Sequence, residues 1–254
     1  MARASGPTRR GFVRRSALAA GGLAIVGGGS GIAAEDGQQG AGGAKAPKPT
    51  GAAAEAEGGG GEEVSPAEDL MREHGVLKRV LLVYAECLRR MTEGGEPPPE
   101  AIADSAGIVR HFIADYHEKL EEDYLFPRFR RANQLVELVD TLERQHAAGR
   151  RVTDVTLQLA NLRSLKEPGD REKLAASMRA FVRMYEPHEA REDTVLFPAL
   201  RKIVSPHEYD ALGEQFEDEE HRRFGEDGFE RMVERVATIE KSLGIYELAQ
   251  FTPR

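Results

Sequence analysis

From residue 65 onwards, apolar and polar positions follow the period of amphipathic α-helices. Apolar residues recur every three or four positions, which places them on one face of a helix. Ser65, Pro66 and Glu68 form a capping box that predicts the start of a first helix running to about residue 91. Pro127 is expected to end or kink the second helix, and Pro187 to kink the fourth. The remaining helices are predicted over about 100–126, 134–162 and 171–203, after Ser205, and over about 227–243. This pattern predicts an all-α domain over residues 65–250.

Each of the four long helices carries one histidine within or beside its apolar stripe: His74, His117, His146 and His188. A single histidine in this setting could be a neutral core residue that makes one hydrogen bond. Glutamate is harder to explain, because a carboxylate in a dry interior is costly unless it is paired or coordinated. Glu121 and Glu192 each follow a histidine by one helical turn, so the sequence leaves two readings, a salt-bridged core or a metal site.

The chain repeats this combination. "HEKLEEDYLFPRFR" begins at His117, and "HEAREDTVLFPALR" begins at His188. Residues i and i+4 project from one helix face about 6 Å apart, so each histidine and glutamate can converge on one ion. Two such helices, with one histidine from each of the other two, supply four nitrogens and two bridging carboxylates. Imidazole with carboxylate suits iron, manganese or zinc, and the repeat favours a dinuclear site over a salt-bridged core.

The repeated His-Glu-x-x-Glu and Leu-Phe-Pro segments resemble the hemerythrin-like family, also called the HHE cation-binding domain, over most of residues 67–200. The resemblance implies an up-down-up-down four-helix bundle, here with one or two extra C-terminal helices. It also implies two oxo- or hydroxo-bridged iron ions, with manganese or zinc as less favoured metals. The ligands that it implies are His74, His117, Glu121, His146, His188 and Glu192, with the two glutamates as bridges.

Three further residues are candidate ligands. Glu118 matches a metal-contacting glutamate in the iron-sensing hemerythrin-like domain of a ubiquitin-ligase subunit. Asp193 stands where oxygen-carrying hemerythrins place an acidic ligand, and His221 lies near the edge of a later apolar stripe. Oxygen carriers also have a second histidine on the third helix where this chain has Arg150, which cannot ligate and argues against reversible oxygen transport. Ferritin-like proteins are a rival, but their Glu-x-x-His order occurs only at Glu143 and His146.

The first 34 residues have a different character. Arg9 and Arg10 precede a mildly apolar, Gly/Ala-rich run, which resembles a twin-arginine export signal. The run is broken by glycines, so no stable membrane span is expected in the mature form. We therefore expect recognition by the twin-arginine (Tat) export machinery and a periplasmic or extracellular location. Residues 35–64, rich in Gly, Ala and Pro, are predicted to be a disordered linker.

Charge and cysteine content exclude other classes. The net charge is −8, which argues against nucleic-acid binding because phosphate contacts need clustered basic residues. Cys87 is the single cysteine, so an internal disulfide or a multi-cysteine metal site is impossible, and core packing is its expected role. His207 falls in the first turn of a helix and is expected on the surface.

The favoured prediction is an exported non-haem di-iron protein that binds iron and, at an open coordination position, dioxygen or a peroxide. The same ligands could serve a di-iron oxidase or peroxidase, or iron storage or sensing, so the sequence does not decide whether the protein is an enzyme. A metal-free helical interaction module, with buried His-Glu pairs, is the alternative from another class. The oligomeric state is not determined by the sequence.

Overall fold

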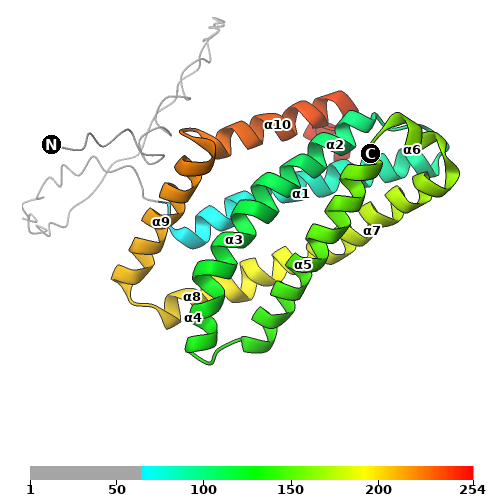
Figure 1. Ribbon diagram of the computed structural model, residues 1–254. Helices are drawn as coiled ribbons and strands as arrows, with labels where there is room; N and C mark the ends of the chain where they lie inside the picture. Colours follow the sequence, from blue (N-terminus) through cyan, green and yellow to red (C-terminus); the bar gives the residue numbers. More distant parts are fainter. Residues whose placement is uncertain (1–63, 254) are drawn as a thin grey trace, which may run out of the picture. The chain divides into compact units, whose positions relative to one another are not determined.

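The computed structural model describes residues 64–253, and every regular element in that range is a helix (Figure 1). The predicted signal segment and nearly all of the predicted linker lie outside the described residues. Four long helices form the bundle. They are α1 (Pro66–Thr92); a second helix made of α2 (Pro99–Ile108), η2 (Val109–His117), α3 (Glu118–Leu120), η3 (Glu121–Leu125) and α4 (Phe126–Arg131); α5 (Val136–Leu159); and a fourth helix made of α7 (Pro168–Arg191), η4 (Glu192–Leu196) and α8 (Phe197–Ile203).

Each bundle helix packs against its neighbours in the chain, and the fourth packs against the first. Contacts join α1 to α2, α2 to α5, α5 to α7 and α7 to α1, which closes the ring of an up-down-up-down bundle (Figure 1). The buried residues between them form a hydrophobic core that includes Leu77, Phe112 and Phe181. The expected all-α, hemerythrin-like bundle is confirmed.

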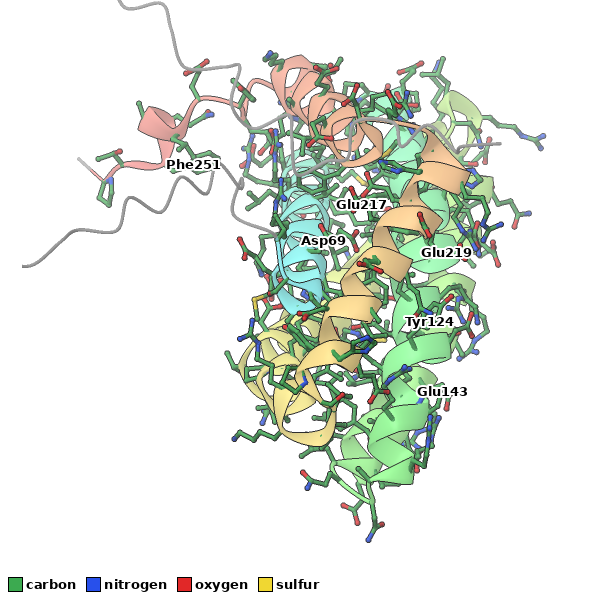
Figure 2. The ribbon with its side chains drawn as sticks, turned by 90° about the vertical axis from the view of Figure 1, so that its left-hand side faces the viewer. Asp69, Tyr124, Glu143, Glu217, Glu219 and Phe251 are labelled. Carbon is green, nitrogen blue, oxygen red and sulfur yellow. The ribbon has the colours of Figure 1, made fainter. Side chains whose placement is uncertain are left out.

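The extra C-terminal helices cover one side of the bundle. Helix α9 (Pro206–Phe224) lies across α1 and the second helix (Figure 2), where Phe216 contacts Tyr124. Helix α10 (Gly228–Leu243) packs on α1 and α2, and the Arg79 Nε atom donates to Glu240 Oε1 at 3.0 Å. The chain then forms a short 3₁₀ turn, η5 (Leu248–Phe251). Both C-terminal helices therefore pack against α1.

The two Leu-Phe-Pro segments produce the same backbone feature. Pro127 and Pro198 have no N–H to donate, and a proline ring inside a helix crowds the carbonyl four residues earlier. Just before each proline the helix widens into a π turn, in which Phe126 N–H bonds to the Glu121 carbonyl and Phe197 N–H to that of Glu192. Such π turns are common at functional sites, and here each begins at a predicted bridging glutamate.

Several predicted helix ends are wrong by a few residues, for identifiable reasons. The second helix does not end near Phe126, because the π turn absorbs Pro127 and the helix continues to Arg131. The third starts at Val136, since Asn133 and Leu135 adopt positive φ. It stops at Leu159, because Asn161 caps the short helix α6 (Leu162–Lys166). Pro187 lies inside α7 without interrupting it.

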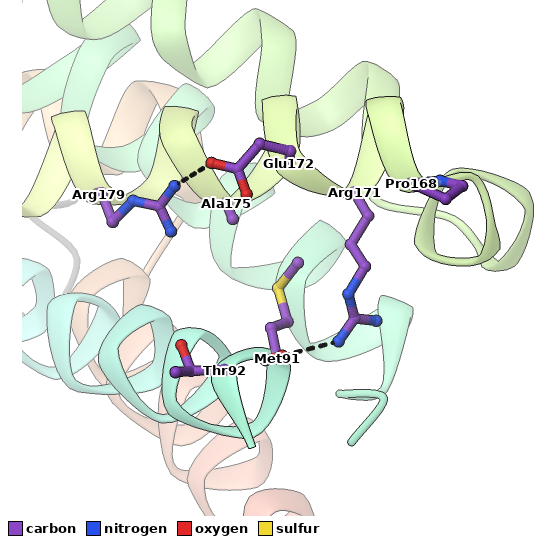
Figure 3. A pocket seen from close by; sticks show the side chains of 7 residues that line it. All are labelled: Met91, Thr92, Pro168, Arg171, Glu172, Ala175 and Arg179. Carbon is purple, nitrogen blue, oxygen red and sulfur yellow. Dashed lines mark hydrogen bonds and ion pairs between the residues drawn. The ribbon is translucent and has the colours of Figure 1, made fainter. Parts of the chain in front are cut away.

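At the far end of α1, a pocket of about 200 Å³ lies between α1 and α7. Figure 3 shows its lining: Met91, Thr92, Pro168, Arg171, Glu172, Ala175 and Arg179. Arg171 donates to the backbone oxygens of Met91 at 3.0 Å and Gly95 at 2.7 Å, so it ties the C-terminal end of α1 to α7. This pocket contains none of the predicted site residues, and its charged lining has a structural role.

Two smaller expectations are also settled. Cys87 is completely buried in α1, and burial raises the pKa of its thiol to about 12; core packing is confirmed. Within residues 64–253, no helix has the length and hydropathy required to cross a membrane.

Candidate metal centre

The four predicted histidines and both predicted bridging glutamates meet inside the bundle. All six side chains are buried, and Glu121, Glu192 and His146 are fully inaccessible. They come from all four bundle helices, because each helix directs its apolar stripe inwards and carries its histidine with it. Their ligand atoms form two sets, each within 4.8 Å: His74, His117 and Glu121 in the first set, and His146, His188 and Glu192 in the second.

Each central carboxylate also reaches across to the other set. Glu192 lies 3.1 Å from His188 Nε2 and 3.4 Å from His74 Nε2. Glu121 lies 3.4 Å from His146 Nε2 and 3.8 Å from His117 Nε2. The two glutamates thus lie between histidines of both sets, which is the position that bridging ligands of two ions would occupy.

The four imidazoles present the same nitrogen to the centre because their Nδ1 atoms are bound elsewhere. Each Nδ1 meets an acceptor from the preceding helix around the ring. Asp193 of the fourth helix bonds to His74 at 2.7 Å, Glu73 of α1 to His117 at 2.7 Å, Glu122 of the second helix to His146 at 3.2 Å, and Gln145 of α5 to His188 at 2.8 Å. Such partners fix the ring orientation and leave Nε2 free to ligate.

A pair of cations fits this arrangement. His117 Nε2 and both oxygens of Glu121 and of Glu192 are buried, yet none of them makes a hydrogen bond. Buried polar atoms without partners are rare, because their desolvation is not compensated. Among the described residues these orphaned atoms gather at one point, and they are nitrogen and carboxylate oxygen donors suited to iron, zinc or manganese. Bound cations would therefore supply the partners that these buried nitrogen and oxygen atoms lack.

The buried charged groups of the centre shift one another's pKa values. Burial, together with the charge of Glu192, raises the pKa of Glu121 well above its usual range. Burial and the positive charge of His74 lower the pKa of His117 well below its usual range, so His117 is the neutral form that binds metals. Burial alone would lower the pKa of His74, but its hydrogen bond to Asp193 and the nearby negative charge of Glu192 raise it to about 9. Without an ion, protons must substitute for cations at this centre.

Glu118 lies next to the cluster but is engaged by other groups. Tyr185 donates its hydroxyl proton to Glu118 Oε1, and Arg150 Nη2 lies 2.8 Å from Glu118 Oε2. Arg150 also contacts Glu122 at 2.7 Å. Arg150, which stands where oxygen carriers have a histidine, thus pairs with two carboxylates beside the centre. A ligand role for Glu118 stays a prediction.

The remaining two candidates occupy different places. Asp193 is at the edge of the site, where it holds His74 by Nδ1. His221 lies half-buried near the end of α9 and belongs to neither set. The structure thus places Asp193 beside the centre, where it orients His74, and it does not bring His221 to either set of ligands.

Sequence reasoning missed three of the residues that orient the histidines: Glu73, Glu122 and Gln145. A signal was present, because each is adjacent in sequence to a candidate ligand, as Asp193 is to Glu192. Adjacent helical residues point about 100° apart, so the neighbour of an inward ligand lies at the helix interface and reaches the next helix. Only the packing of the helices shows which histidine each of these three residues contacts.

The site has approximate twofold symmetry. Phe126 stacks on His146 and Phe197 on His74, each with ring centroids 5.5 Å apart. Lys78, four residues after His74, pairs with Glu189, just as Arg150, four residues after His146, pairs with Glu118. The first two bundle helices are therefore repeated by the last two, as the duplicated sequence motif suggests.

Gly149 is required by the packing of Tyr185. A Cβ atom at Gly149 would lie 2.8 Å from Tyr185 Cε2 and would overlap its hydroxyl group, whereas Gly75 on α1 faces open space. Gly149→Ala should therefore destabilise the protein by about 1–3 kcal/mol through overpacking. Gly75→Ala should stabilise it by roughly 0.5–1 kcal/mol, because alanine is the better helix former. Denaturant unfolding of both variants measures this, and two changes of the same sign would contradict the assigned packing.

A helical bundle whose four helices direct histidine and glutamate to one buried point is a metal-binding bundle. The comparisons with known proteins agree with this class. The hemerythrin HHE cation-binding domain matches residues 65–167. Uncharacterized proteins of Mycobacterium bovis and Mycobacterium tuberculosis are each 53% identical over 190 residues, which is 75% of this chain and 74% of theirs. The chain belongs to the hemerythrin HHE cation-binding domain family. No solved structure matches it.

Proposed function

We propose that this protein is an exported non-haem di-iron protein that binds dioxygen or a peroxide as its small ligand. The observation that carries the proposal is the convergence of four histidine Nε2 atoms on two buried carboxylates that make no hydrogen bonds. Cation binding in the family and the repeated histidine-glutamate motif support it. Two ions are favoured over one because each carboxylate lies between histidines of both sets.

The number of donors supports a reactive metal pair over a closed structural site. Each ion would receive two histidines and a share of two carboxylates, which leaves positions open for a small ligand. Two histidines with carboxylate and open positions are typical of non-haem iron. Bound iron would supply reversible one-electron chemistry and a Lewis-acidic coordination position.

The protein's own side chains would prepare the site. The four Nδ1 partners hold the imidazoles in position, and Phe126 and Phe197 pack on two of the rings and exclude water. Tyr185 keeps a proton at Glu118, and its ring lies 5.1 Å from that of His188. This buried hydroxyl is the one feature that favours an oxidase or peroxidase as the second candidate, since such reactions need a proton near the ligand.

Iron content and location test the proposal together. The full chain is expressed, and iron per chain is measured in the exported protein, followed by visible spectra after reduction, oxygenation and azide addition. We expect an iron pair in each chain and charge-transfer bands that change with each treatment. A variant with Arg9→Lys and Arg10→Lys should remain in the cytoplasm with the same iron content. A wild-type chain that folds without iron and gains no stability from it would instead support the metal-free interaction module.

A further inference from the structure

The approximate twofold symmetry of the metal centre does not extend to the groups that accept hydrogen bonds from the histidine Nδ1 atoms. In the first set, the Nδ1 atoms of both histidines bond to carboxylates: His74 to that of Asp193 and His117 to that of Glu73. In the second set, His146 Nδ1 bonds to the carboxylate of Glu122, but His188 Nδ1 bonds to the amide oxygen of Gln145. Gln145 occupies the place that corresponds to Glu73, one residue before the histidine of its helix. One of the four support positions is therefore neutral.

The surrounding charges enlarge this difference. On the second set's side, Glu122 is 3.0 Å from Lys119 and 2.7 Å from Arg150, and Arg150 also pairs with Glu118. Two cations thus offset two carboxylates there. Beside the first set, Lys78 pairs with Glu189 as the counterpart of Arg150, but Ala190 stands at the position that corresponds to Lys119. On the first set's side, the ligand atoms of Glu73, Asp69 and Glu220 lie within 4.8 Å of one another, all buried, so two further acidic residues lie beside the support of His117.

Both effects act on a bound cation in the same direction. A carboxylate on the far nitrogen of an imidazole increases the basicity of the ligating nitrogen, and loss of such a partner typically costs about 10–100-fold in metal affinity. A fixed cation near the metal adds repulsion, which is strong where the dielectric is low. The first set is therefore the better cation site, although its ligands match those of the second set in type and number.

We propose that the two metal positions are unequal, with the His74–His117 position binding its ion more tightly and Gln145 keeping the His146–His188 position weak. This inference rests on the proposed function, since it requires that both positions bind metal. The unequal pair would hold one ion firmly as a structural ion and exchange or release the other, which suits a site that responds to iron supply.

Anaerobic titration of the metal-free full chain with Fe²⁺, followed by calorimetry, tests the inequality. The wild type should show two binding events whose affinities differ by about 10-fold or more. Gln145→Glu should strengthen the weaker event by roughly 10-fold and leave the tighter one unchanged. Glu73→Gln, which places an amide at the corresponding position, should weaken the tighter event. Gln158→Glu is the matched control, because it adds the same charge to an exposed position of α5 and should change neither event.

Half-site variants provide a second measurement that does not depend on coupling between the ions. His188→Ala retains the first position, and His117→Ala retains the second. Each should bind a single ion, with His188→Ala binding it about 10-fold more tightly or better. Circular dichroism establishes that both variants are folded.

The possible results separate the two proposals. Two Fe²⁺ ions that bind the wild type with one common affinity, or a Gln145→Glu variant with an unchanged weaker event, would overturn the inequality and leave the di-iron proposal standing. Equal affinities in the two half-site variants would do the same. A wild-type chain that takes up no Fe²⁺ in this titration would overturn the proposed function, and the inequality with it.

Discussion

Replacing His117 with alanine should abolish loading of the iron pair and leave the helical content unchanged. His117 is buried, and its Nε2 atom makes no hydrogen bond while facing Glu121 at 3.8 Å. Loss of this imidazole removes one of two nitrogens from the first metal position and leaves a cavity in place of a ligand. Iron content should fall to one ion per chain, with the charge-transfer bands of the pair lost. Elemental analysis, visible spectra and circular dichroism measure these quantities.

His207→Ala is the matched control for this substitution. His207 is exposed in the first turn of α9, where Ser205 caps the helix by accepting from Glu208 N–H. Removal of this imidazole should leave both the iron content and the spectrum as in the wild type. A His117→Ala protein that keeps both irons would remove His117 from the ligands. Altered bands in His207→Ala would show that the site extends to α9.

Replacing Glu121 with leucine should make the metal-free protein more stable while it eliminates binding of the metal pair. Both Glu121 oxygens are buried without a hydrogen bond, and burial raises the pKa of its carboxyl well above the usual range. A carboxyl group in this environment opposes folding, and replacement of buried ionic groups by apolar ones often stabilises a protein by about 1–4 kcal/mol. Denaturant unfolding in the presence of a chelator measures the gain. A less stable Glu121→Leu protein would mean that Glu121 is already compensated without metal.

Glu122→Leu should have the opposite effect, although the two glutamates are adjacent. Glu122 accepts from Arg150 at 2.7 Å and Lys119 at 3.0 Å, and it supports His146. Burial would raise the pKa of Glu122, but these bonds outweigh it and lower the pKa from 4.5 to about 2. Loss of such charge-assisted bonds should destabilise the protein by about 1–3 kcal/mol.

The contribution of Glu122 should also depend on pH. Because its pKa is lower in the folded protein than in the unfolded chain, its stabilisation is complete above about pH 5 and is lost as the pH falls towards 2. The stability difference between wild type and Glu122→Leu should therefore shrink on acidification. A difference that stays constant from neutral pH to about pH 3 would contradict this assignment.

Much of the fold followed from the sequence, because helix periodicity and capping depend on local interactions. Ser65 caps the first helix as predicted, and Ser205 caps α9 in the same way, with each serine oxygen accepting from the backbone N–H three residues on. The errors concern backbone geometry under tertiary constraint. The helix does not end at Pro127, which was one of the two outcomes expected there, because the backbone accommodates the proline with a π turn and continues to Arg131.

The six central residues could be predicted for the same local reason. A histidine followed by glutamate at i+4 lies on one face, and the apolar stripe fixes that face towards the core, so His188 and Glu192 had to point inwards together. The groups that hold the histidines could not be assigned in this way. Glu73 supports His117, 44 residues away, and Asp193 supports His74, 119 residues away. Helical period alone does not show which neighbour each of them faces.

By itself, the sequence determined an all-α domain and the inward direction of a repeated histidine-glutamate motif, because both depend on the period of a helix. Only the tertiary structure decided that the four Nδ1 supports form a closed ring, that Arg150 pairs with both Glu118 and Glu122, and that Gln145 breaks the symmetry. These features depend on the rotation and height of each helix relative to the next. Packing of the whole core sets those quantities, and no single helix encodes them.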